Sequence, residues 1–418
     1  MTAMSVVDSP ARRADGPVDE STPLLSIDLS AVAANTRVFT RRAGGELMAV
    51  VKADGFGHGA ADVARTALTA GATWLGVTSL SEAVDLRQRG IDAPILSWLN
   101  PIAAAFEVAL TACVDVGVPS ADHLDAVVRR APGARVHLMI DTGMARDGCP
   151  PSLWSVLCRR AAAYERSGLI TVVGVMGHLP MADVPADRSN SVGRQRFQAA
   201  LAAAFGAGLR PVHHHLAATA ATLNDPASHH TLSRVGAGLV GIDPTRSTID
   251  QTRFTTDQTS RGRSADVLRP ALSLRAPLVE VRRVAAGTSV GYGRAWRARR
   301  PTTLGLLPLG YADGLPRIAS GRAFVSVAGH RCPLVGTGSM DMSVVDLGPS
   351  SEAHPGTSVL VFGPGDSGEP TVTEWASWAG TIEHEIVTGI GARVSRRLIP
   401  AGEPTTIWQP RVVRDGCR

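Results

Sequence analysis

The sequence contains almost no lysine. Of its 42 basic residues, 41 are arginines and only one, Lys52, is a lysine. Arginine can replace lysine as a surface charge, but at working pH it cannot form an imine with an aldehyde. The single lysine is either a remnant of drift in an arginine-rich chain or a residue kept for chemistry that arginine cannot perform. Lys52 is therefore the first candidate functional residue.

Cysteine, aromatic residues and long apolar runs are also scarce. The five cysteines are odd in number and lack C-x-x-C spacing, which favours reduced thiols in the cytoplasm over a disulfide framework or a zinc site. Only 18 aromatic residues and scattered basic residues disfavour a nucleic-acid partner. No continuous apolar stretch of about 18 residues occurs, so no membrane span is expected. The polar residues 1–24 are predicted to form a disordered leader.

Short β-type segments alternate with helical segments between residues 25 and 243. Alternation of this kind predicts a parallel sheet covered by helices, and eight repeats indicate a (β/α)8 TIM-type barrel. The eight predicted strands are residues 47–51, 74–78, 95–98, 114–118, 136–140, 171–177, 212–215 and 231–235.

The chain after residue 243 differs from the predicted barrel in composition and residue pattern. At 418 residues, two domains are the default expectation. Residues 244–269 are rich in Thr, Ser, Arg and Asp without periodicity, and indicate a linker or insertion. Residues 270–418 contain short strand-like segments divided by Gly and Pro and one helix-like segment near 371–380, and predict a mostly antiparallel β domain. The predicted fold is therefore an α/β barrel followed by a β domain.

Candidate site residues follow the predicted barrel strands, where barrel enzymes place their chemistry. They are Lys52, Arg146, His178, Thr219, Arg234 and the Gly-Ala-Gly segment 236–238. The loops after the last two strands are a common phosphate site in such barrels. Together, these positions predict one pocket for an aldehyde cofactor that carries a phosphate.

Each of these residues also has an ordinary structural explanation. A lone histidine such as His178 is more often structural, and an exposed arginine is usually only a charge. The run His213, His214, His215 suggests a metal site, but alternate side chains of a strand point to opposite faces, so no metal is predicted. Only the joint placement at strand ends favours a functional site.

The motif AVVKADGFGHG resembles the lysine motif of the alanine racemases, which are fold-type III enzymes dependent on pyridoxal phosphate. Further segments resemble the family in the same order along almost the whole chain after the leader. They are SLSEAVDLRQRGI, IDTGMARDG, LRPALSLRAPLVEVRRVAAGTSVGYGRAW, LPLGYADGLPR, GTGSMDMSVVDLG and EIVTGIGARVSRR.

The resemblance implies a cofactor, pyridoxal 5'-phosphate, and a role for each matching residue. Lys52 would bind the cofactor covalently and act as one catalytic base. Tyr292 would be the second base, reaching the site from the β domain of a partner subunit in a homodimer. Cofactor contacts would come from His178 against the ring, Arg234 at its nitrogen, and Thr219, Gly236 and Ala237 at its phosphate.

The substrate side is implied in the same way, for a small amino acid. Arg146 and Met340 would lie near the substrate carboxylate. The residues that would line the pocket or its opening are Tyr311, Arg317, Asp183 and Asp341.

These implied roles agree with the chemistry of racemisation. Removing a Cα proton from one face and returning a proton to the other is simplest with one base on each face. A tyrosine pKa of about 10 is high for a base at neutral pH. Tyr292 would therefore need positive charge or hydrogen-bond donors, which His178 and Arg234 are expected to relay.

Four positions depart from the family pattern. Phe56 stands where many members have Tyr, and Met139 replaces a lysine that orients the arginine matching Arg146. Ala218 replaces a common Asn, and Ala392 stands where some members have a gating Tyr. The substrate-shaping residues are therefore less well matched than the catalytic pair.

Three functions remain open from the sequence. The first is an alanine racemase with Lys52 and Tyr292 as its bases. The second is a related enzyme acting on another amino acid or catalysing a different reaction at Cα, which the four departures motivate. The third is a non-catalytic carrier of pyridoxal phosphate, which the presence of Tyr292 on a complete β domain disfavours.

Overall fold

The computed structural model describes residues 21–244 and 267–402. The predicted leader before residue 21 and most of the predicted 244–269 linker lie outside the described residues. The chain forms two compact units. The barrel unit comprises the chain from Ala31 to Arg269, and the β unit comprises the segment up to Ser30 together with the chain from Pro270 onward.

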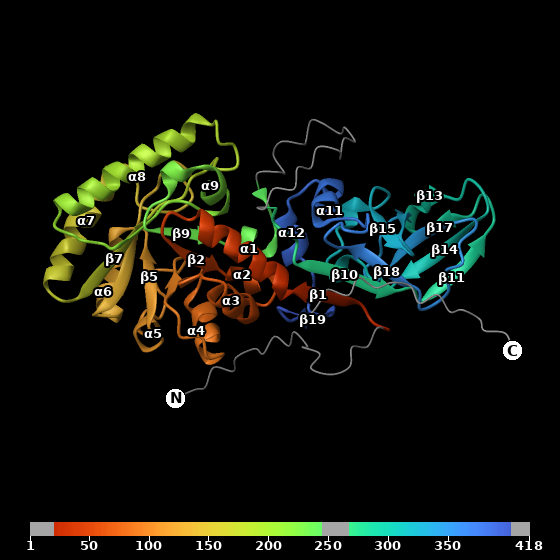
Figure 1. Ribbon diagram of the computed structural model, residues 1–418, viewed down its shortest axis with the longest axis horizontal. Coiled ribbons are helices and arrows are strands. Elements are labelled where there is room, and N and C mark those ends of the chain that lie inside the picture. The colour runs from red at the N-terminus through yellow and green to blue at the C-terminus, as the bar shows by residue number, and fades with distance from the viewer. Residues whose placement is uncertain (1–20, 245–266, 403–418) are drawn as a thin grey trace. The chain divides into compact units, whose positions relative to one another are not determined.

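The barrel unit contains a sheet of eight parallel strands in the order β8-β7-β6-β5-β4-β3-β2-β9 (Figure 1). The two edge strands of this sheet, β8 and β9, approach each other. Arg234 N in β9 donates to Ala217 O, just after β8, at 3.0 Å, so the sheet is nearly closed into a barrel. The predicted eight-stranded barrel is confirmed. The strands are β2 (Glu46–Val50), β3 (Trp74–Val77), β4 (Ile95–Ser97), β5 (Val114–Val118), β6 (Ala134–Met139), β7 (Ile170–Met176), β8 (His213–His215) and β9 (Leu232–Val235).

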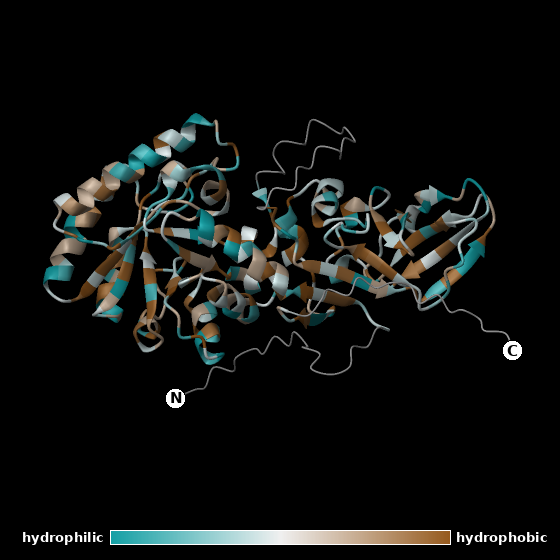
Figure 2. Ribbon diagram, in the orientation of Figure 1, coloured by the Kyte–Doolittle hydropathy of each residue, from teal (hydrophilic) through white to brown (hydrophobic). Residues whose placement is uncertain are grey.

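Helices cover the outside of this sheet, and three of those in the described residues, α4, α6 and α8, begin after a residue whose side chain caps the helix. Strands β3 and β5 are buried along their whole length, as expected for parallel strands covered on both faces. Hydrophobic residues are frequent in the strands of the barrel unit (Figure 2). Ser79 and Glu82 form a reciprocal capping box at the start of α4. The helices are α1 (Leu29–Arg42), α2 (Lys52–Gly57), α3 (Ala60–Thr69), α4 (Leu80–Gln88), α5 (Glu107–Thr111), α6 (Ala121–Arg130), α7 (Pro151–Arg166), α8 (Arg188–Gly206) and α9 (Thr219–Asn224).

The β unit contains a nine-stranded sheet in the order β11-β14-β17-β16-β15-β18-β10-β1-β19. All its pairs are antiparallel except β1 with β19, which confirms the predicted mostly antiparallel architecture. The strands are β1 (Leu24–Asp28), β10 (Leu272–Pro277), β11 (Glu280–Val284), β14 (Thr302–Leu307), β15 (Phe324–Val327), β16 (His330–Val335), β17 (Ser343–Gly348), β18 (Ser358–Phe362) and β19 (Ser395–Ile399).

Three smaller features complete the β unit. Strands β12 (Ser289–Val290) and β13 (Trp296–Arg297) form a separate pair. The helix predicted near 371–380 is α11 (Val372–Ala379), and a second helix, α12 (Glu383–Thr388), follows it without having been predicted. No helix within the described ranges of either unit is long and apolar enough to cross a membrane.

Candidate active site

Lys52 lies directly after β2, at the start of a strained turn. The next four residues, Ala53 to Phe56, have left-handed φ angles between 51° and 61°. This conformation costs roughly 1–2 kcal/mol for each residue other than glycine. Backbone strain of this kind persists only where the surroundings enforce it, and it is concentrated at functional sites.

The surroundings of the turn supply the hydrogen bonds that enforce it. Ala53 N donates to Glu82 Oε1 at 2.7 Å, while Glu82 Oε2 accepts from Thr78 N at 2.9 Å. Burial opposes ionisation of Glu82, but hydrogen bonds from Thr78, Ala53 and neighbouring groups outweigh it and lower the pKa of the carboxyl. On the other side, the buried His58 donates from Nδ1 to Phe56 O at 2.8 Å. A carboxylate and a buried imidazole therefore hold the turn that begins at the lysine.

The electrostatic environment of Lys52 favours its neutral amine. Burial lowers the pKa of Lys52, and the nearby positive charge of Arg146 acts in the same direction, whereas Glu82 partly opposes them. An amine whose pKa is lowered in this way is a better nucleophile and base near neutral pH.

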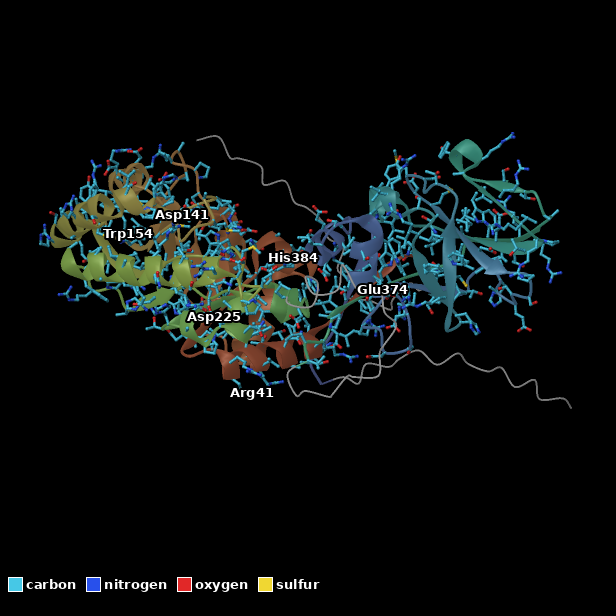
Figure 3. The ribbon with its side chains drawn as sticks, turned by 90° about the horizontal axis from the view of Figure 1, so that it is seen from above. Arg41, Asp141, Trp154, Asp225, Glu374 and His384 are labelled. Atoms are coloured by element: carbon cyan, nitrogen blue, oxygen red, sulfur yellow. The ribbon has the colours of Figure 1, made fainter. Side chains whose placement is uncertain are left out.

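Arg146 lies in the loop that follows β6, and Asp141, labelled in Figure 3, belongs to the same loop. Asp141 Oδ1 accepts hydrogen bonds from the backbone N–H groups of Gly143, Met144 and Ala145 at 2.8, 3.0 and 3.1 Å. These bonds outweigh the effect of burial and lower the pKa of Asp141. Arg146 thus lies in a loop whose backbone is fixed by hydrogen bonds to Asp141. The apolar Met139, at the end of β6, is buried.

His178 and Arg234 lie side by side after β7 and in β9. Arg234 Nη2 donates to Gly177 O at 2.6 Å and approaches His178 Nδ1 at 3.4 Å. Burial lowers the pKa of His178 to about 3, assisted by the positive charges of Arg234, Arg146 and Lys52. Burial also lowers the pKa of Arg234 to about 10, so the guanidinium keeps its proton at neutral pH. His178 is therefore neutral at neutral pH and offers hydrogen bonding, whereas Arg234 carries the positive charge.

Arg234 is also the end of a relay of four buried side chains. Its Nη1 donates to His215 Nδ1 at 3.1 Å, His215 Nε2 lies 2.9 Å from His137 Nδ1, and His137 Nε2 lies 3.2 Å from Asp115 Oδ2. None of the four is more than 5% exposed. An arginine only donates and a carboxylate only accepts, so every proton in the relay points from Arg234 toward Asp115. The relay supplies the buried guanidinium with a distant negative charge.

The far end of this relay is held at the surface by a second arginine. Arg135 Nε donates to Asp115 Oδ1 at 2.8 Å, and its side chain is half exposed. Burial would raise the pKa of Asp115, but hydrogen bonds and charge from His137 and Arg135 lower it. As predicted, neighbouring histidines of β8 diverge: His213 stacks on His137, whereas His214 contacts Phe205.

Two uncapped backbone segments that suit a phosphate group follow β8 and β9. A Cβ atom at Gly236 would lie 2.7 Å from the Phe56 ring, so only glycine fits between the two segments. Helix α9 begins at Thr219 after Ala218, and the η2 turn (Ala237–Val240) begins after Gly236; neither start has a side-chain cap. Uncapped backbone N–H groups at such starts are the donors that phosphates bind.

The donor set of the barrel unit fits pyridoxal phosphate. One lysine with a lowered pKa suits the aldehyde, and a buried arginine suits the pyridine nitrogen. Within the described residues, Arg234 Nε and Thr219 Oγ1 have no hydrogen-bond partner, although both residues are buried. These two donors are the groups that would face the ring nitrogen and the phosphate.

The remaining predicted site residues lie in the β unit. Tyr292 lies in a short turn after β12 and is 72% exposed; Tyr311 and Met340 are also exposed. Asp341 binds Arg393, with 2.8 Å between Oδ1 and Nη1. The structure therefore groups Lys52, Arg146, His178, Thr219, Arg234, Gly236 and Ala237 in one unit and Tyr292, Tyr311, Arg317, Met340 and Asp341 in the other. Asp183 lies in the barrel unit, in the segment between β7 and α8.

Sequence reasoning missed several residues that shape the site. Glu82 had a recognisable signal, because it is three residues after Ser79 in a capping box. Asp115 and His137 had none, since a single polar residue in an apolar strand does not reveal its partner on the neighbouring strand. The glycines of the Lys52 motif hinted at an unusual turn, but not at left-handed angles for Ala53 and Phe56.

Two family models together match nearly all of the described chain. The model described as alanine racemase, N-terminal domain, matches residues 27–244, and the model described as alanine racemase, C-terminal domain, matches residues 271–398. The alanine racemase of Thermobifida fusca is 42% identical over 375 residues, which cover 88% of this chain and 96% of the relative.

The chain is also similar to solved structures of alanine racemases. The alanine racemase from D-cycloserine-producing Streptomyces lavendulae superposes with a TM-score of 0.85 at 38% identity, covering 92% of this chain and 98% of that one. The alanine racemase from Bartonella henselae, whose structure holds covalently bound pyridoxal phosphate, superposes with a TM-score of 0.79 at 25% identity, covering 92% of this chain and 100% of that one.

Proposed function

Since this chain belongs to the alanine racemase family, we propose that it interconverts L- and D-alanine with Lys52 and Tyr292 as its two bases. The observation that supports this most directly is the placement of the only lysine. Lys52 follows the first barrel strand on an enforced turn, with its pKa lowered by burial and by Arg146.

The cofactor would be held by residues of the barrel unit. Lys52 Nζ would bind its aldehyde, Arg234 would donate to its ring nitrogen, and Thr219, Gly236 and Ala237 would surround its phosphate. Pyridoxal phosphate, when bound, withdraws electrons from the substrate and makes its Cα proton acidic.

The side chains then have distinct tasks. On one face, Lys52 Nζ removes or returns the Cα proton, and on the other face Tyr292 Oη does the same. Arg234 keeps its proton at neutral pH and binds three backbone carbonyls, so it holds a fixed positive charge in the site. With the cofactor bound, that charge would disfavour a proton on the ring nitrogen and so would limit side reactions. Arg146 would bind the substrate carboxylate.

Exchange at Cα tests this function. The cofactor-loaded protein is incubated with L-alanine in heavy water, and the products are separated by chirality and analysed by mass. D-alanine with deuterium at Cα is the expected product. Deuterium in L-alanine alone would mean one working base, and no exchange with either enantiomer would shift the function to another amino acid or another Cα reaction.

The proposed homodimer shares its active sites between subunits. The high exposure of Tyr292 within the β unit supports this, because a catalytic side chain is expected to be covered in the working enzyme. Mixing Lys52→Arg with Tyr292→Phe subunits tests it. If sites are shared, each mixed dimer has one site with both bases intact, and activity returns; if each chain forms its own site, the mixture stays inactive.

The proposed cellular location is the cytoplasm, and the five cysteines are consistent with it. The four cysteines within the described residues form no disulfide. Fractionation of the producing cells would test the location, and recovery outside the cytoplasmic fraction would contradict it.

A further inference from the structure

One arginine of the β unit joins three backbone turns that lie far apart in the sequence. Arg393 Nε donates to Asp313 Oδ1 at 3.0 Å, and Arg393 Nη1 donates to Asp341 Oδ1 at 2.8 Å. The three turns, together named the three-turn cluster, are residues 310–314, 338–342 and 389–393.

Asp313 is the centre of this cluster. Its side chain is buried, its Oδ1 also lies 2.9 Å from Arg393 Nη2, and its Oδ2 accepts a hydrogen bond from Gly310 N at 2.9 Å. A buried carboxylate needs partners of this kind, since an unpaired buried charge is costly. The hydrogen bond with Asp341 and the charge of Asp313 raise the pKa of Arg393. One guanidinium therefore bridges two carboxylates from two turns.

Backbone hydrogen bonds join the same turns. Tyr311 N donates to Ser339 O at 3.2 Å, and Ala312 N donates to Met340 O at 2.9 Å. Gly391 N donates to Asp313 O at 3.0 Å. Tyr311 and Met340, both exposed, are thus carried on turns that are tied to each other and to Arg393.

The cluster continues into the turn that carries Tyr292. Gly291 has a φ of +74°, and a Cβ atom there would lie 2.9 Å from Thr337 N. A Cβ atom at Gly336 would lie 2.9 Å from Val290 O. The backbone of residues 290–291 therefore lies directly against that of residues 336–337, which lead into the 338–342 turn.

We infer that Arg393 is a positioning residue for Tyr292, Tyr311 and Met340, acting through Asp313 and Asp341. This deepens the proposed function and rests on it for the role of Tyr292. The side chain itself touches neither substrate nor cofactor in this role. It fixes the relative positions of the turns that present the second base and the substrate-facing groups.

The test compares three variants of the cofactor-loaded protein: Arg393→Gln, Arg393→Lys and, as matched control, Arg331→Gln. Arg331 lies in the same unit and pairs with Glu374 of α11, with 3.0 Å between Nη2 and Oε2 (Figure 3). Its loss removes a comparable ion pair outside the three-turn cluster. Backbone hydrogen exchange is measured by mass spectrometry, and deuterium incorporation at Cα is measured from each enantiomer of alanine.

Arg393→Gln should speed exchange in the three turns and residues 289–294 by about tenfold, the loss expected for a charged hydrogen bond. It should lower kcat on the order of 10²-fold, as a misplacement of about 1 Å can do. The deficit should be larger for the same enantiomer that Tyr292→Phe slows, and the cofactor absorbance should not change. Arg393→Lys should restore part of both effects, and Arg331→Gln should show neither.

Each contrary result has a separate meaning. Unchanged exchange in the three turns of Arg393→Gln would overturn the inference, whatever the activity. Faster exchange with unchanged kcat and no difference between enantiomers would overturn the link to Tyr292. If the parent protein does not racemise alanine while Arg393→Gln still loosens the turns, the structural link is supported and the proposed function fails.

Discussion

The barrel unit and the β unit hold their candidate site residues in different ways. In the barrel unit, Arg234 is buried, and burial together with neighbouring charges shifts the pKa of Lys52, His178 and Arg234. In the β unit, Tyr292 is 72% exposed, and its position depends on close contacts between backbone turns.

This difference indicates that the two proposed bases, Lys52 and Tyr292, obtain their reactivity and position from different sources. The chemistry of Lys52 is set by burial and by charges within its own unit. Tyr292 has no such environment within the β unit and must obtain it from whatever surface covers it. The barrel unit can therefore be perturbed electrostatically, whereas the β unit is perturbed through geometry.

The largest effect is expected from removing Lys52, the proposed base of the barrel unit. Lys52→Arg keeps a positive charge but no nucleophilic amine, so catalysis should fall by about 10⁴-fold or more. The absorbance of covalently bound cofactor should disappear, while the far-UV circular dichroism stays unchanged. A persistent band of bound cofactor in this variant would disprove the role of Lys52.

Removal of the β-unit base should have a different signature. Tyr292→Phe should leave cofactor binding and stability unchanged, because the hydroxyl lies on an exposed side chain. Proton exchange at Cα should slow by about 10²- to 10⁴-fold, and more from one enantiomer than from the other. Tyr164→Phe, which changes a tyrosine of the barrel unit, is the control. Equal and unchanged exchange from both enantiomers would show that Tyr292 is not a base.

The sequence predicted the barrel well for a physical reason. Parallel strands buried on both faces read as short apolar segments, and β5 matches its predicted range 114–118. The position of Lys52, His178 and Arg234 followed from one general rule, that barrel chemistry lies at strand ends. Local pattern and topology were sufficient for these features.

Long-range polar contacts could not be predicted in the same way. Asp115 and His137 are 22 residues apart and His215 is 78 residues beyond His137, so only the closed barrel brings them together. Arg393 and Asp313 are 80 residues apart. The pKa of His178 could not be predicted either, because it depends on burial beside Arg234 and not on its place in the sequence.

An effect of intermediate size is expected from changing the relay that joins Arg234 to Asp115 in the barrel unit. Asp115→Asn removes the negative charge that balances Arg234 and should lower the free energy of unfolding by about 3 kcal/mol, as for a broken buried pair. Cofactor affinity should weaken by about tenfold, since Arg234 loses orientation. Chemical denaturation and cofactor titration measure the two effects.

The control for this prediction is an exposed pair of the same unit. Asp85 binds Arg89 at 2.9 Å with both side chains about half exposed, and Asp85→Asn should cost under about 1 kcal/mol. If Asp115→Asn were as mild as Asp85→Asn, the relay would contribute nothing beyond a surface ion pair.

The smallest effect concerns His178, whose folded-state pKa of about 3 lies below its ordinary value of 6.5. Between these values the unfolded chain binds a proton that the folded chain does not, so the free energy of unfolding falls as the pH falls. The slope from this group approaches about 1.4 kcal/mol per pH unit within the window. His178→Asn should remove that part of the slope in cofactor-free protein, whereas His330→Asn, at an exposed site of the β unit, should not. Equal slopes in the parent and His178→Asn would mean that burial beside Arg234 does not control this imidazole.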